Sequence, residues 1–183
     1  MRVISGASSH LPEGLYPRLA HYRYQVFVER LGWQLPVQNQ AETDRFDSSD
    51  SVYVVAEEPD GEISGCARLL PTNGPYLLSA EFPEVLNGAP PPCDPTIWEL
   101  SRFCAVHLSR RSATSLADFP NSAAALLMRE AMACAAAHGA RRLITVTALA
   151  MERLIRRLGI HSHRMGPPHI VGGEPIYGCW IEL

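Results

Sequence analysis

Apolar residues recur at helical spacing in the first part of the chain. They lie three to five positions apart and end just before Gly32, a residue type that often follows a helix: Leu15, Leu19, Tyr22, Val26 and Leu31. This spacing predicts an amphipathic helix over about residues 12–31. Residues 33–50 are polar and irregular, which is typical of a loop.

The pattern then changes to short apolar runs separated by turn residues. Residues 52–57 and 63–70 flank Pro59-Asp60-Gly61-Glu62, which predicts a β-hairpin. Residues 71–96 are rich in Pro and Gly, with a short helix predicted at 81–86. The remaining pattern predicts a strand at 97–107, a helix at 121–138 capped by Asn121 or Ser122, a strand at 143–147, a helix at 149–158 and a hairpin at 169–183.

This order of elements predicts an α/β (α+β) fold. Strands dominate early and helices cross over later, so we expect a mixed central sheet with helices on its faces. A length of 183 residues fits one domain, with bounds 1–183.

Composition excludes several classes of protein. The net charge is −3 and all 16 basic residues are Arg, so general nucleic-acid binding is not expected. There is no apolar run long enough to span a membrane and no secretory pattern at the N-terminus, which predicts a cytoplasmic protein without a membrane anchor. The five cysteines are scattered and His161, His163 and His169 lack matched ligand spacing, so neither a disulfide framework nor a metal site is expected.

The strongest chemical signal lies inside the predicted strand 97–107. Glu99 and Arg102 interrupt an apolar run, and burying charges without partners is costly. In a regular strand Glu99 and Ser101 share one face and Arg102 takes the other, so we expect a bulge if both charges serve one site. Arg68 lies in another apolar strand, so it too is expected to be a buried charge that needs an acidic partner. A purely structural Glu–Arg network is the alternative.

Three weaker clusters accompany this one. Arg23 and Phe27 share a helix face, with Trp33 beyond; a core Phe beside a surface Arg is the alternative. Asp44 and Asp47 are three residues apart and predict a local negative site, unless they belong to a solvated loop. A basic helix face suits an acidic partner or a phosphate, although such stripes are usually only solvated: Arg153, Arg156 and Arg157.

These clusters, in this order, resemble the LuxI-type acyl-homoserine-lactone synthases of bacterial quorum sensing. The matching positions are Arg23, Phe27, Trp33, Asp44, Asp47, Arg68, Glu99 and Arg102. The sequences around these positions match as well, in RYQVFVERLGW, FDSSDSVYVVA, GCARLLP and WELSRF. The stretch MERLIRRLGIHSHRMGPP looks like the branch that makes medium-chain products.

The resemblance implies a GCN5-related N-acetyltransferase-like fold and two substrates. These are S-adenosylmethionine (SAM) and an acyl group on acyl carrier protein, or on CoA in some members. The products are an N-acyl-homoserine lactone, 5′-methylthioadenosine (MTA) and the free thiol. SAM is a substrate, so no cofactor is expected, and the reaction requires no metal.

The resemblance also assigns roles. Glu99 is the expected base, directly or through a water, with Arg102 and Ser101 as the other catalytic residues. The residues expected to bind SAM, through ion pairs and cation–π attraction, are Arg23, Phe27, Trp33, Asp44, Asp47 and Arg68. The expected walls of the acyl pocket are Phe82, Leu100, Met128, Thr147, Leu149, Met151 and Leu154. Plain core positions are the alternative for these residues. The acidic carrier protein is expected to dock on Arg153, Arg156 and Arg157.

Two alternatives remain open. An N-acetyltransferase of the same fold usually carries R/Q-x-x-G-x-G/A after its central strand, whereas residues 109–121 contain no Gly. A non-catalytic ligand-binding domain of this fold is expected to have lost at least one of the eight charged or aromatic positions, and all eight are present.

Overall fold

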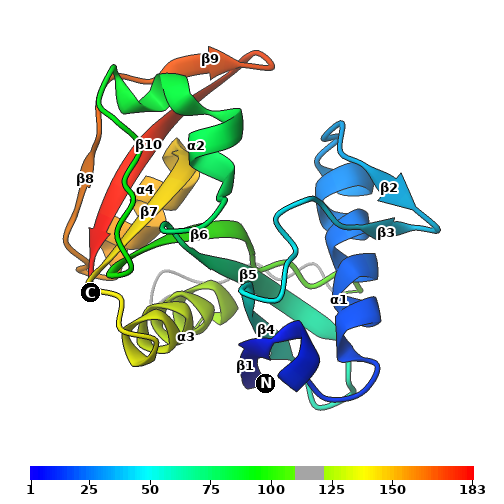
Figure 1. The fold of residues 1–183 in the computed structure, drawn as a ribbon. Helices are drawn as coiled ribbons and strands as arrows, with labels where there is room; N and C mark the ends of the chain where they lie inside the picture. Colours follow the sequence, from blue (N-terminus) through cyan, green and yellow to red (C-terminus); the bar gives the residue numbers. More distant parts are fainter. Residues whose placement is uncertain (110–121) are drawn as a thin grey trace. The chain divides into compact units, whose positions relative to one another are not determined.

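The structure is a computed structural model that describes residues 1–109 and 122–183 (Figure 1). It divides into two compact units. The first unit contains Met1–Arg68 and Arg102–Ala131, and the second contains Leu69–Ser101 and Met132–Leu183. Residues 110–121, which include Asn121 and the Gly-free segment, lie outside the described part.

The first unit is built on strands and one long helical segment. Its strands are β1 (Arg2–Ala7), β4 (Val52–Glu57) and the first part of β5 (Ile63–Pro71), and β1 pairs antiparallel with β4. Its helical segment is α1 (Leu15–Arg23) followed directly by the π-helix η2 (Tyr24–Arg30). The short elements are η1 (Ser8–His10), β2 (Val37–Gln38) and β3 (Ala41–Glu42).

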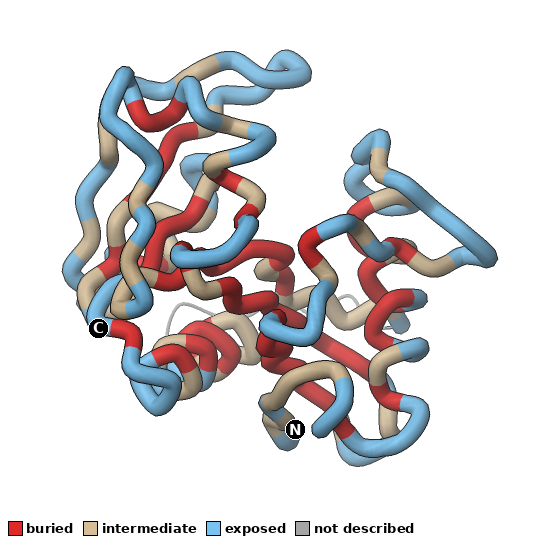
Figure 2. Tube along the Cα trace, in the orientation of Figure 1, coloured by how far each residue is buried: buried red, intermediate tan, exposed pale blue. Residues whose placement is uncertain are grey.

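The core of this unit lies between the helical segment and β4 and β5. Leu15, Leu19, Tyr22 and Val26 all point into it and pack with strand residues such as Tyr53. Figure 2 shows the same burial as continuous red stretches along the two strands. The apolar spacing of the sequence thus describes the face that the helix buries.

The second unit contains the rest of the sheet except Arg102–Cys104, which belong to the first unit. β6 (Ile97–Cys104) pairs parallel with β7 (Arg142–Ala148), and β7 pairs antiparallel with β10 (Glu174–Glu182). β10 also pairs with β8 (Ser162–Arg164) and β9 (His169–Val171). The helices are α2 (Leu77–Glu81), η3 (Pro83–Leu86) and α4 (Leu149–Arg157), and α3 (Ala123–Ala137) begins in the first unit and ends here.

Within the described residues the strand order is β1-β4-β5-β6-β7-β10-β8, with β9 paired to β10. The sheet is mixed, because β6 and β7 are parallel whereas β1–β4 and β7–β10 are antiparallel, and the connection from β6 to β7 contains α3. The predicted mixed sheet with helices on its faces is therefore confirmed.

The predicted elements differ from the structure in instructive places. The predicted helix 12–31 is one segment that changes from α to π at Tyr24, and Leu31 N–H donates to the Val26 carbonyl five residues back. The irregular loop predicted at 33–50 contains the β2–β3 hairpin, and the sequence pattern missed β1 and β8 as well. The single short helix predicted at 81–86 is divided into α2 and η3.

Burial of the α1 face predicts a matched pair of stability effects. Leu19 is 1% exposed and Leu31 is 53% exposed. Leu19→Ala is expected to lower the free energy of unfolding by about 2–5 kcal/mol, because it leaves a cavity in the core. Leu31→Ala is expected to change it by less than about 0.5 kcal/mol. Urea denaturation of both variants measures the difference, and equal losses would contradict the assigned helix face.

Candidate active site

Six charged side chains of the first unit form a continuous set of ion pairs, here called the charge network. It contains Arg23, Arg68, Arg102, Glu42, Asp44 and Asp47. Arg23 donates from Nε to Glu42 at 2.6 Å and from Nη1 and Nη2 to Asp47 at 2.8 and 3.1 Å. All three nitrogens of this guanidinium are therefore paired with acids of the network.

The other two arginines share the same acids. Arg68 donates to both oxygens of Asp44, at 2.6 and 3.1 Å, and to Asp47 at 2.9 Å. Arg102 donates from Nη2 to Glu42 at 2.9 Å and to Asp44 at 2.8 Å, with Nε 3.3 Å from each Glu42 oxygen. Every acid thus bridges two arginines.

Burial makes this pairing necessary. The side chains of Arg23, Arg68 and Glu42 are between 0% and 1% exposed. Burial alone would raise the pKa of Asp47, but the hydrogen bonds and charges of Arg23 and Arg68 outweigh it and hold that pKa well below its ordinary value. Three fixed positive charges and three carboxylates balance, so the cluster is stable only as a complete set.

Local backbone structure brings the acids to the arginines. The segment after β3 folds into a turn in which Phe46 N–H donates to the Asp44 carboxylate at 2.9 Å and Asp44 N–H donates to Asp47 at 2.7 Å. Phe46 is buried, and the guanidinium of Arg68 lies 5.8 Å from its ring centroid. The acidic side chains of this segment are therefore paired and largely buried, whereas Thr43, Arg45 and residues 48–50 are exposed.

Arg102 has an unusual backbone. Its φ of 50° lies in the left-handed region, which breaks the pleat of β6 where the sequence predicts an irregularity. The Sγ of Cys66 donates to the Arg102 carbonyl at 3.3 Å. The break turns the Arg102 side chain out of the regular alternation and into the charge network.

An aromatic pair adjoins the network. Phe27 and Trp33 are stacked, with ring centroids 4.9 Å apart, and the Arg102 guanidinium lies 5.7 Å from the Phe27 centroid. Trp33 is 45% exposed. This arrangement offers an accessible aromatic face beside charged groups, which suits a cationic, planar ligand.

Glu99 and Ser101 belong to the second unit. Glu99 is 1% exposed, and its two oxygens accept the backbone N–H groups of Leu77 and Leu78 at 2.9 and 2.6 Å. The carboxylate thus caps the start of α2. Ser101 is 7% exposed. The roles assigned to both residues stay predictions.

The residues predicted to line the acyl pocket come from several elements of the two units. Leu100 is buried on β6, Thr147 is buried on β7, and Phe82 lies between α2 and η3. Leu149, Met151 and Leu154 all lie on α4, and Leu149 is 43% exposed. Met128 lies on α3 in the first unit. Their shared role as a pocket stays a prediction.

The predicted basic face is exposed. Arg153, Arg156 and Arg157 all reach solvent from α4. Glu152 lies 3.5 Å from Arg156 and 2.7 Å from Arg164, so part of this charge is balanced locally.

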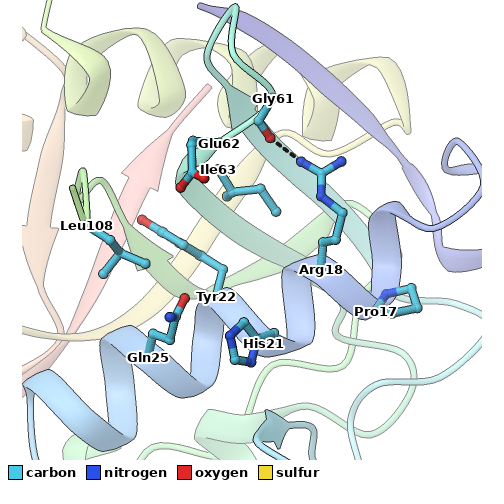
Figure 3. A pocket seen from close by; sticks show the side chains of 9 residues that line it. All are labelled: Pro17, Arg18, His21, Tyr22, Gln25, Gly61, Glu62, Ile63 and Leu108. Carbon is cyan, nitrogen blue, oxygen red and sulfur yellow. Dashed lines mark hydrogen bonds between the residues drawn. The ribbon is translucent and has the colours of Figure 1, made fainter.

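A cavity of about 480 Å³ lies beside α1 in the first unit, and no residue of the charge network lines it (Figure 3). Two polar side chains at its wall form hydrogen bonds to other parts of the protein. Arg18 donates to the Gly61 carbonyl and to Glu57, and the Tyr22 hydroxyl donates to the Val106 carbonyl. Within the described residues there is no group of three or more potential metal ligands and no helix that is able to span a membrane.

Sequence reasoning named five of the six residues of the charge network but did not include Glu42 among the site residues. Glu42 pairs with Arg102, 60 positions away, and spacing along one element does not reveal such a contact. Its position in the run Glu42-Thr43-Asp44 was the available signal.

Comparison with known proteins supports a common family. The sequence model of the autoinducer synthase family matches residues 13–182. The acyl-homoserine-lactone synthase of Acinetobacter nosocomialis is 46% identical over 183 residues, covering 100% of both chains. The acyl-homoserine-lactone synthase of Ralstonia solanacearum is 48% identical and covers 100% of this chain and 89% of its own length.

Solved structures give the same result. TofI in a ternary complex with an inhibitor and MTA superimposes with a TM-score of 0.84 at 42% identity, covering 100% of this chain and 91% of that one. The acyl-homoserine-lactone synthase LasI superimposes with a TM-score of 0.85 at 34% identity, covering 99% and 89%. An N-acetyltransferase from Lactobacillus plantarum, 19% identical with a TM-score of 0.60, shares the fold alone. The chain therefore belongs to the autoinducer synthase family and is an acyltransferase of the acyl-homoserine-lactone synthase type.

Proposed function

We propose that the chain makes an N-acyl-L-homoserine lactone from SAM and a medium-chain acyl group carried by acyl carrier protein. The observation that supports this most is the charge network beside the stacked Phe27–Trp33 pair. SAM carries a sulfonium, a carboxylate and an α-amine. A cluster of fixed charges next to an accessible aromatic face matches all three kinds of group.

Arg102 is the proposed ligand of the SAM carboxylate. All three guanidinium nitrogens of Arg23 are paired with Glu42 and Asp47. Arg102 pairs through Nε and Nη2, and among the described residues no protein group binds its Nη1. A carboxylate needs such an available N–H donor, so the hydrogen bonds favour Arg102 over Arg23.

Trp33 and Phe27 are the proposed contacts of the adenosyl sulfonium. Their stacked rings present one half-exposed aromatic surface, Trp33. Attraction between a cation and the face of a Trp ring contributes about 0.5–2 kcal/mol, depending on how dry the contact is. Asp44 and Asp47 act through the arginines that they hold in place.

The reaction proceeds in two steps. The protonated α-amine of SAM loses one proton to Glu99, directly or through a water, and the free amine attacks the thioester carbonyl. The carbon–sulfur bond of the thioester then breaks, and the leaving carrier thiolate takes up the second proton that the attacking nitrogen releases. The SAM carboxylate next attacks the γ-carbon of the same molecule, the carbon–sulfur bond breaks, and MTA leaves. Backbone N–H groups near the break in β6 are proposed to stabilise the oxyanion of the first step.

Acyl carrier protein is the proposed donor, docked on Arg153, Arg156 and Arg157, while acyl-CoA is the alternative. The exposed arginines of α4 fit an acidic protein. The structure of the CoA-dependent synthase BjaI with SAM and isopentyl-CoA, 25% identical to this chain, favours the alternative donor. The medium-chain preference rests on the sequence of residues 151–168.

Incubation of the purified chain with SAM and acyl donors of four to twelve carbons tests the proposed reaction. Each donor is supplied on carrier protein and on CoA, and mass spectrometry follows both products. Acyl-homoserine lactone and MTA are expected in equal amounts, with the highest kcat/KM for a medium-chain acyl carrier protein. An acylated amine without MTA would indicate simple acyl transfer and contradict lactone formation. A preference for acyl-CoA would replace the proposed donor.

The docking proposal predicts an effect on one substrate only. Arg153→Ala combined with Arg157→Ala is expected to lower kcat/KM for acyl carrier protein roughly tenfold, the size of a 1–2 kcal/mol loss of charge pairing. The KM for SAM is expected to stay unchanged. Arg30→Ala, which removes an exposed Arg of η2 in the first unit, is the control. An equal effect of the control would show that only net charge matters.

A further inference from the structure

We propose that Glu42 is a positioning residue of the synthase reaction, which fixes the orientation of Arg102. This inference rests on the proposed function, because Arg102 is the proposed ligand of the SAM carboxylate. Glu42 is 0% exposed, so it acts through the arginine and not by touching substrate.

The contacts of Glu42 determine which side of Arg102 remains available. Glu42 accepts the Nε and Nη2 edge of the Arg102 guanidinium, at distances between 2.9 and 3.3 Å. Its other strong contact, Arg23 Nε at 2.6 Å, prevents the carboxylate from turning. Nη1 of Arg102 is consequently the nitrogen that points away from the acids.

The β2–β3 hairpin delivers Glu42 to this position. Val37 pairs with Glu42, and the two turn residues, Asn39 and Gln40, have φ angles of 53° and 58°. Left-handed geometry at residues other than Gly costs on the order of 1 kcal/mol each, so other contacts must hold the turn. His21 of α1 does so, because its Nδ1 lies 2.9 Å from the Gln40 carbonyl oxygen. The hairpin is therefore held to α1 at its turn and at Glu42.

Glu42 also supplies one of the three negative charges that the charge network needs. With Glu42 present, three carboxylates neutralise three arginines. Loss of the Glu42 charge leaves Asp44 and Asp47 to neutralise all three. Arg102 then has only Asp44 as an acidic partner. The guanidinium is expected to turn toward Asp44, which removes its Nη1 from the position that binds the SAM carboxylate.

Glu42→Gln tests the inference, with Glu57→Gln as a matched control. Glu57 is also a buried carboxylate of the first unit that pairs with two arginines, Arg2 and Arg18, but it lies outside the charge network. Glu42→Gln is expected to raise the KM for SAM roughly 10- to 100-fold, the range for losing one hydrogen bond between charged groups. The KM for the acyl donor is expected to change less than about threefold. Glu57→Gln is expected to lower the urea midpoint of unfolding without changing either KM.

Two further variants keep the test decisive if Glu42→Gln does not fold. Glu42→Asp retains the charge but shortens the side chain, and it is expected to raise the KM for SAM several-fold. This rise is expected to be smaller than the rise caused by Glu42→Gln. If Glu42 acts through Arg102, the double variant Glu42→Asp with Arg102→Lys is expected to have the same KM for SAM as Arg102→Lys alone.

The outcomes separate the two proposals. An unchanged KM for SAM in both Glu42 variants, or an equal rise in Glu57→Gln, would overturn the positioning role while the unmodified chain still makes product. Additive effects of the Glu42 and Arg102 changes would overturn it as well. Failure of the unmodified chain to bind SAM in calorimetry would overturn the proposed function and the role of Glu42 together.

Discussion

Arg23 imposes the constraint on which the first unit depends. A guanidinium does not lose its proton in a protein, so an arginine with a 1% exposed side chain must be neutralised by acids. Its partners come from β3 and from the turn that follows, and those acids also neutralise Arg68 of β5 and Arg102 of β6. Four separate parts of the chain are therefore held in one arrangement, because any other would leave a buried charge unpaired.

The charge network is part of the core structure of the first unit and part of the proposed SAM site. Replacing such a cluster by apolar side chains is often neutral or stabilising, so stability alone does not require six buried charges. The network keeps one donor of Arg102 available beside a half-exposed Trp33. In the proposed reaction, the buried ions hold the Arg102 guanidinium at a fixed orientation before substrate arrives, which avoids reorganisation during the reaction.

Long periodic elements were predicted from the sequence because their signal is local. The hairpin of residues 52–70 and the helices at 121–138 and 149–158 follow from apolar spacing and from Gly or turn residues at their ends. β2 and β3 are two residues long each, which is too short for any alternation to be visible. Even so, the change from α to π geometry left a trace, since Leu31 follows Val26 at a spacing of five.

The site was only partly predictable, for a physical reason. Buried charges in apolar strands mark Arg68, Glu99 and Arg102, because their desolvation must be compensated. The identity of the compensating group is a long-range contact, and the sequence does not specify it. Glu99 illustrates the limit: its acceptors are used by the first N–H groups of α2, a helix that the pattern placed several residues too late.

The burial of the charge network also determines how its ion pairs respond to ionic strength. At physiological salt, mobile ions largely screen interactions between exposed charges that are more than about 8 Å apart, but they screen buried pairs much less. Salt therefore screens the charge of Arg156, whose side chain is 77% exposed, much more than the charges of Arg23 and Glu42, which are buried. If the acyl donor docks on α4 as proposed, salt weakens mainly that encounter and leaves the internal ion pairs intact, so ionic strength distinguishes the two groups of arginines without any mutation.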